Sequence, residues 1–181
     1  MNTASDNRAP GKGGLPAGIL WGGLICGVMD INAAFIDVKV NFDMGPVRLL
    51  QNVAGALLGP AAYDGGPPTA MLGLAMHFTV AFTAATVFHL LSRRFPGLLL
   101  WAVPAGLAYG AVVFIVMYRG VIPLMIELKT LYLTTSFNHT PPKLRWSQLL
   151  VHLFCVGLPI ALAARRFALP PPVASTPVPA A

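Results

Sequence analysis

The chain has 181 residues, of which 56% are hydrophobic and 10% are charged, and its formal net charge is +6. Soluble domains carry about 25% charged residues, and a chain of this length cannot bury so large an apolar fraction. The composition excludes a soluble globule, a disordered chain, a collagen and a disulfide scaffold, and it predicts an integral membrane protein. Its basic residues are scattered as isolated pairs, with no basic helix or patch, which argues against a nucleic-acid partner.

The first element expected is a polar, Gly-rich lead at 1–14, followed by a membrane span at about 16–35. Pro16 suits the first turn of that helix, because the missing N–H would have no partner there. A cleaved signal peptide is excluded, since Asp30 and Asn32 stand where small residues would form the cleavage site.

A short amphipathic helix is expected in the first outer loop, at Pro46–Leu58, between Gly45 and Gly59-Pro60. Its apolar residues, Val47, Leu50, Ala54, Leu57 and Leu58, fall at helical spacing opposite Arg48, Gln51 and Asn52.

Three further spans are predicted at about 71–91, 98–120 and 146–164. The first of these has no charged residue and reaches roughly 31 Å, enough to cross the hydrocarbon core. Residues 121–145 mix apolar and polar groups and leave room for a second surface helix. The Pro-rich stretch at 167–181 is expected to be disordered. The predicted fold is therefore all-α, an integral membrane four-helix bundle within residues 15–166.

The positions of the arginine pairs predict the orientation of this bundle. Arg93-Arg94 lie in the tight second loop and Arg165-Arg166 follow the fourth span. Basic residues in short loops favour the cytoplasmic side. Both termini are therefore expected in the cytoplasm, in a multi-pass protein of a bacterial inner membrane.

The sequence also contains a candidate internal repeat. Pro16-Ala17-Gly18 recurs 88 residues later as Pro104-Ala105-Gly106. A true duplication would give two tandem helical hairpins in the same orientation. The alternative is coincidence in a sequence rich in Gly, Ala, Val and Leu.

Small residues at four-residue spacing predict close helix packing in the first and third spans. The glycines concerned are Gly18, Gly22, Gly23, Gly27, Gly106 and Gly110. They would pack helices within one bundle, or, as the rival interpretation, join two copies in a homodimer.

Ionisable side chains inside membrane spans are costly, and they are therefore functional candidates. One polar group per span falls at a comparable depth in the outer half of the predicted bundle: Asp30, His77, Tyr118 and His152. Such a cluster could serve as a proton relay or a metal site. The competing interpretation makes each histidine an ordinary hydrogen-bonded or interfacial residue. His89 is too far along its helix from His77 to share one ion.

No resident cofactor is expected, although haem or a metal at His77 and His152 is a weaker alternative. The identity of any metal is left open. No catalytic or nucleotide-binding motif occurs in the sequence, so an enzyme is disfavoured though not decided.

Three segments resemble a family of small, uncharacterised bacterial inner-membrane proteins of the domain-of-unknown-function type. They are Gly45–Gln51, Gly73–Phe78 and Val156–Ala161. The resemblance covers roughly residues 15–166. It implies a four-helix membrane protein with His77 at a family-motif position, and it implies no activity.

Two functions are therefore carried forward. The first is a non-enzymatic accessory or interaction protein with membrane-protein partners, or with copies of itself. The second is a small oligomeric transporter or proton-coupled permease that uses the polar cluster.

Overall fold

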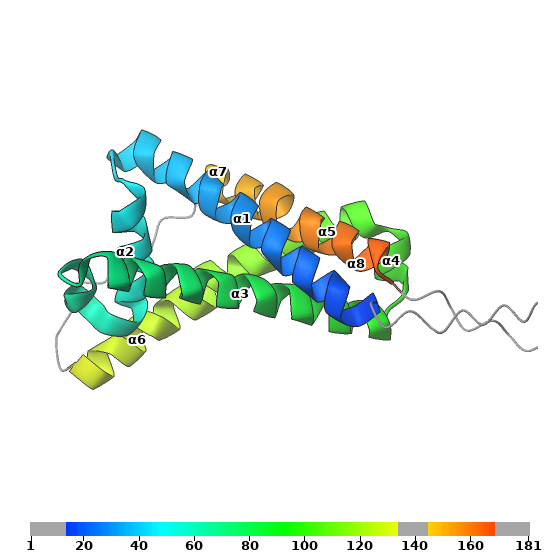
Figure 1. Ribbon diagram of the computed structural model, residues 1–181. Coiled ribbons are helices and arrows are strands. Elements are labelled where there is room, and N and C mark those ends of the chain that lie inside the picture. Colours follow the sequence, from blue (N-terminus) through cyan, green and yellow to red (C-terminus); the bar gives the residue numbers. More distant parts are fainter. Residues whose placement is uncertain (1–13, 134–144, 169–181) are drawn as a thin grey trace, which may run out of the picture.

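The computed structural model describes residues 14–133 and 145–168, and all of the secondary structure in these residues is helical. The predicted all-α fold is confirmed. The long elements are α1 (Gly14–Phe42), α3 (Gly66–Arg94), the composite helix α5 (Ala102–Val116), η2 (Met117–Val121) and α6 (Ile122–Leu133), and the composite helix α7 (Trp146–Val151), η3 (His152–Gly157) and α8 (Leu158–Arg166). They form an elongated bundle (Figure 1).

In the part of the chain that the structure describes, three short elements connect these helices. α2 (Pro46–Leu58) and the 3₁₀ turn η1 (Gly59–Tyr63) join α1 to α3, and α4 (Gly97–Leu100) precedes α5. α2 crosses the end of the bundle where α1 ends and α3 begins (Figure 1). The start of α1 and the end of α8 lie together at the opposite end.

The helices are longer than the apolar segments that predicted them. α1 continues to Phe42, past the expected end at residue 35, because no Pro or Gly interrupts the chain before Gly45. α3 begins at Gly66, since Pro67 and Pro68 are tolerated in a first turn. The third helix continues past residue 120 as α6, where a separate surface helix was one expectation.

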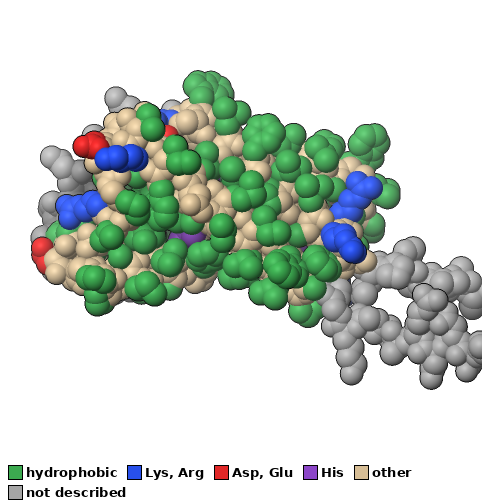
Figure 2. Space-filling view, turned by 45° about the horizontal axis from the view of Figure 1, so that its top comes forward, with side chains coloured by type: hydrophobic (Ala, Val, Ile, Leu, Met, Phe, Trp, Pro, Cys, Tyr) green, Lys and Arg blue, Asp and Glu red, His purple; other side chains and the backbone are tan. Residues whose placement is uncertain are grey.

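Within the described residues, four helical segments are long and apolar enough to cross a membrane: Pro16–Phe42, Gly66–Arg94, Ala102–Glu127 and Trp146–Arg166. Large hydrophobic side chains cover much of the surface between the two ends (Figure 2). Trp101 and Trp146, 70% and 82% exposed, stand at the starts of the third and fourth spans. Tryptophans in such positions are typical of membrane interfaces. The four spans and the apolar surface together indicate a membrane protein.

Two spans contain a π-helical segment, and each segment is followed closely by a proline. η2 precedes Pro123, and η3 precedes Pro159. A proline inside a helix has no N–H, and its ring clashes with the carbonyl four residues earlier. A local widening of the helix relieves that clash. Pro104 causes no such distortion, because it lies in the first turn of α5.

The predicted packing glycines of α1 all face neighbouring helices. A Cβ atom on Gly18 would lie 2.6 Å from the His89 ring of α3, and one on Gly27 would lie 2.6 Å from Phe78. Gly23 faces Phe82 in the same way, and Gly22 faces α8 at Ile160 and Ala163. These contacts lie within one chain.

The third and fourth spans approach each other even more closely. A Cβ on Gly106 would lie 2.9 Å from the carbonyl oxygen of Gly157, and one on Gly110 would meet the His152 backbone. Gly157 and Gly73 were not among the predicted glycines. Gly157 packs against the backbone of Gly106 and Gly110, and Gly73 packs against the Leu50 carbonyl of α2.

The amphipathic helix α2 forms where expected, but its orientation differs from the predicted polarity. Gln51, expected on the polar face, is buried, and Leu57 and Val47 are exposed. The Gln51 amide nitrogen donates to the Gly66 carbonyl oxygen at 3.2 Å. The Gln51 side chain is therefore buried because its hydrogen-bond acceptor lies at the start of α3.

The structure leaves two predictions undecided. α1 and α5 run in the same direction (Figure 1), but any four alternating helices would do so, and the proposed duplication stays a prediction. The predicted lead and tail, apart from Gly14, Phe167 and Ala168, lie outside the described residues, as does the segment 134–144.

Candidate binding cavity

A partly open cavity of about 650 Å³ lies in the half of the bundle that contains α2. It is bounded by α1, α2, α3, the α5–η2–α6 helix and η3. The lining residues that the argument uses are Cys26, Asp30, Asn52, His77, Thr79, Val80 and His152, with Met76, Met117 and Met125 among the apolar walls.

The cavity exists because the close packing of α1 on α3 does not extend along the whole helix. Gly27 is the last glycine of α1, so larger side chains separate the two helices beyond it. α2 then crosses the widened end and contributes Asn52, Val53 and Ala56 to the wall. η2 and η3 contribute residues from their π-helical turns, which are frequent at functional sites in membrane and soluble helices.

Asp30 and His77 lie next to each other in the lining of the cavity. The Oδ2 atom of Asp30 lies 3.9 Å from Nδ1 of His77, and the side chains are 22% and 14% exposed. This separation is too long for a direct hydrogen bond. Both residues lie near the middle of their helices, since α1 and α3 extend beyond the predicted spans.

A hydrogen bond from Nε2, the other ring nitrogen, explains the orientation of the His77 ring. Nε2 lies 2.9 Å from the carbonyl oxygen of Gly27. A carbonyl oxygen can only accept a hydrogen bond, so Nε2 carries the proton and donates. In the neutral ring, Nδ1 is then an acceptor that points toward the Asp30 carboxylate.

His152 reaches the cavity from the fourth span. Its Nδ1 atom lies 2.8 Å from the Gln148 carbonyl oxygen and donates to it by the same reasoning. The ring packs edge-on against Phe114, with the centroids 5.4 Å apart. Its Nε2 atom is therefore the acceptor of the neutral ring.

Tyr118 differs from the other three predicted cluster residues. Its ring lies 6.4 Å from the His152 ring, centroid to centroid, and 4.7 Å from Phe114. It is not one of the residues that line the cavity. Asp30, His77 and His152 thus share one cavity, and Tyr118 packs behind His152.

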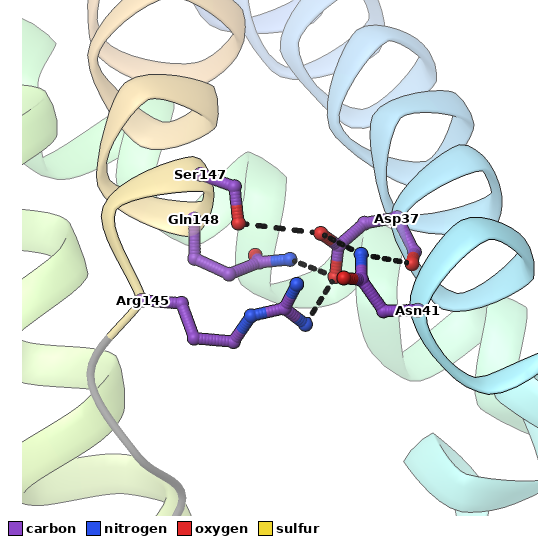
Figure 3. Close-up of polar contacts among 5 residues, drawn as sticks. All are labelled: Asp37, Asn41, Arg145, Ser147 and Gln148. Atoms are coloured by element: carbon purple, nitrogen blue, oxygen red, sulfur yellow. Dashed lines mark hydrogen bonds and ion pairs between the residues drawn. The ribbon is translucent and has the colours of Figure 1, made fainter.

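A second polar group, absent from the predicted cluster, joins the first and fourth spans. The Asp37 carboxylate accepts hydrogen bonds from Arg145 at 3.0 Å, Gln148 at 2.9 Å and Ser147 at 3.3 Å (Figure 3). Asn41, one turn later on α1, also donates to it at 3.2 Å. The Asp37 side chain is only 10% exposed, so this ion pair lies at a protected contact between helices.

A signal for this group was present in the sequence. Asp37 follows Asp30 by seven residues, which places both carboxylates on one helix face. That signal has meaning only if α1 continues to residue 42, whereas the span predicted from the sequence ends at about residue 35. The lining methionines carried no comparable signal, since apolar residues are common throughout the chain.

His89 lies outside the cavity, at the other end of α3. Its side chain is buried, and Nδ1 has no hydrogen-bond partner in the structure. Within residues 14–133 and 145–168, no three His, Cys, Asp or Glu side chains are placed to hold a metal ion.

Comparisons with known proteins add no relative. No protein-family model, no curated protein and no solved structure matches the chain. The cavity and its polar groups therefore carry the functional argument.

Proposed function

We infer that this protein is a non-enzymatic, multi-pass membrane protein that binds a small, largely apolar molecule from the bilayer. Its binding site is the cavity between α1, α2, α3, α6 and η3. In this role the protein would be an accessory or carrier component for the bound molecule. The observation that carries the proposal is one partly open cavity that combines apolar walls with a few polar groups at one place.

The size and lining of the cavity support this proposal. Ligand sites are typically hollows of roughly 300–1,000 Å³ with apolar walls and a few polar groups that orient the ligand. Three methionines line this cavity, and Met side chains adapt readily to different ligand shapes.

The position of the opening supports entry from the bilayer. Thr79 and Val80 line the cavity and are exposed on the outer surface of α3. Both lie near the middle of an apolar span that runs from Gly66 to Arg94. An apolar molecule dissolved in the lipid could therefore reach the cavity without crossing water.

The proposed setting is a bacterial inner membrane with both termini in the cytoplasm. Arg93-Arg94 end α3 and Arg165-Arg166 end α8 at the same end of the bundle. The positive-inside rule favours the cytoplasm for that end. The carboxylates Asp43 and Asp64 lie in the connections around α2, at the opposite end.

Binding of a neutral apolar probe tests the cavity. The protein is placed in phosphatidylcholine nanodiscs, and radiolabelled 1-decanol is measured by equilibrium dialysis against empty nanodiscs. The expected result is one saturable site per chain. The variant Ala56→Trp fills the cavity from α2 and should abolish that site.

The matched control is Ala75→Trp, which places the same side chain on the exposed surface of α3. Saturable binding should persist in this variant. Absence of a saturable site in the native chain, or equal binding by both variants, would overturn the proposal.

The second candidate is a small oligomeric proton-coupled permease, and the Asp30–His77 pair favours it. A carboxylate beside a histidine inside a bilayer can exchange a proton with a transported molecule. Reconstituted vesicles with an imposed proton gradient would accumulate labelled probe if this candidate is correct. Accumulation that persists in Asp30→Asn vesicles would contradict it.

A further inference from the structure

The polar groups around Asp30 are nearly all hydrogen-bond acceptors. The ring N–H groups of His77 and His152 donate hydrogen bonds to the carbonyl oxygens of Gly27 and Gln148. The Thr79 hydroxyl likewise donates to the Ala75 carbonyl at 2.8 Å. With both imidazole rings neutral, what remains for a ligand is the Asp30 carboxylate, the second imidazole nitrogens of His77 and His152, and the Thr79 oxygen.

Asn52, on the α2 side of the cavity, is already engaged by protein groups. Its carbonyl oxygen accepts from the Tyr63 hydroxyl, and its nitrogen lies 3.3 Å from the Met44 sulfur. Its second amide N–H remains a donor at the α2 wall of the cavity.

The formal charge of the cavity lining also bears on the kind of ligand. Asp30 is the one Asp, Glu, Lys or Arg side chain among the described residues that line it. Arg145, which directly precedes the fourth span, is paired with Asp37 and does not line the cavity. A carboxylate held in an apolar cavity favours a positively charged partner that donates hydrogen bonds.

The gap between Asp30 and His77 provides the place for such a partner. The two acceptor atoms are 3.9 Å apart and make no direct hydrogen bond. An ammonium group placed beside both could donate one hydrogen to Oδ2 and another to Nδ1. Its alkyl chain would then follow the apolar wall of Val80, Val113 and Met125.

We propose that the ligand of this cavity is a lipophilic primary amine, which binds as the ammonium ion between Asp30 and His77. The proposal rests on the proposed binding function and specifies its ligand class. Carboxylate and phosphate amphiphiles are excluded, because Asp30 and both imidazole acceptors would repel them.

A series of ten-carbon probes tests the ligand class, using the full chain in phosphatidylcholine nanodiscs and equilibrium dialysis against empty discs. The probes are decylammonium, decyltrimethylammonium, 1-decanol and decanoate. Decylammonium should bind most tightly and decanoate should show no saturable site. Decyltrimethylammonium should bind more weakly than decylammonium, since it has the charge without the N–H donors.

The substitution Asp30→Asn removes the charge and retains the size. We expect it to weaken decylammonium binding by about tenfold or more, and to leave 1-decanol binding unchanged. Asp43→Asn makes the same chemical change at an exposed site paired with Lys39. This control should bind every probe as the native chain does.

The possible outcomes separate the two proposals. Equal saturable binding of all four probes, or equal decylammonium binding by native and Asp30→Asn chains, overturns the amine proposal and leaves the cavity function standing. Absence of saturable binding for every probe overturns both. Should Asp30→Asn not fold, the order of the probes on the native chain decides, and decanoate binding as tight as decylammonium overturns the amine proposal.

Discussion

The imidazole of His77 lies 2.9 Å from the carbonyl oxygen of Gly27, which belongs to the neighbouring helix α1. This contact forms because Gly27 has no side chain and lets α3 approach. It orients the ring so that its second nitrogen faces Asp30, one turn farther along α1. A glycine selected for helix packing thus also positions a polar group of the cavity.

The hydrogen bonds of the two cavity histidines predict opposite tautomers. Neutral His77 should carry its proton on Nε2, and neutral His152 should carry it on Nδ1. Long-range ¹H–¹⁵N spectra of histidine-labelled protein in nanodiscs distinguish the two forms. His77→Gln and His152→Gln variants assign the signals, and exchanged tautomers would contradict the structure.

The Asp37 group should contribute measurably to stability. Asp37→Ala leaves Arg145 and Gln148 without their shared acceptor at a protected helix contact. A hydrogen bond to a charged group contributes roughly 1.5–3 kcal/mol, so a loss of about 2 kcal/mol in the free energy of unfolding is expected. Reversible unfolding in mixed micelles measures the change.

The control for this prediction is Asp43→Ala, which breaks an exposed ion pair with Lys39. Exposed pairs contribute about 0–1 kcal/mol. A loss equal to that of Asp37→Ala would show that the Asp37 contacts carry no special stability.

Gly157 should tolerate no side chain. A Cβ atom there would collide with the backbone of Gly106 and Gly110, and backbone cannot move aside as a flexible side chain can. Overpacking of this kind costs roughly 1–3 kcal/mol, and thermal unfolding of Gly157→Ala should show it. Gly120→Ala is the matched control, because its Cβ would meet no atom within 4 Å. Equal stability of the two variants would contradict the observed packing.

The buried amide of Gln51 should fasten α2 to the start of α3. Gln51→Leu removes the hydrogen bond to the Gly66 carbonyl oxygen, which keeps its bond from the Thr69 hydroxyl, and a hydrogen bond of this kind contributes about 0.5–1.5 kcal/mol. Limited proteolysis at the α1–α2 connection should accelerate in this variant. Asn32→Leu removes an exposed amide that bonds only within α1, and it should leave proteolysis unchanged. Faster cleavage in both variants would argue against a specific role of Gln51.

Local sequence predicted the helices more reliably than their lengths. The apolar runs around Met71–Leu91 and Leu149–Ala164 identify spans because hydropathy is a property of each segment alone. The ends were less accurate. Charged residues such as Asp37 and Lys39 end the apolar run, but charge does not end a helix where neither Gly nor Pro intervenes.

The cavity was only partly predictable. Comparable depth along the spans brought Asp30, His77 and His152 forward as candidates, and the structure places these three around one space. The depth of a residue along a span does not, however, define the direction in which its side chain points around the helix axis. Tyr118 has a similar position along its helix, yet it contacts the His152 ring and does not line the cavity, whereas its neighbour Met117 does.

The sequence by itself determined the class of this protein. The low fraction of charged residues, 10%, and the four apolar runs are properties of composition and of local segments. They assign the chain to a membrane whatever contacts its residues make in the folded protein. Only the tertiary structure decided which polar groups meet. Asp37 joins Arg145 across 108 residues, and Gly27 orients His77 across 50. Such pairs depend on how closely helices approach and how they are rotated, and the packing of the whole bundle sets both.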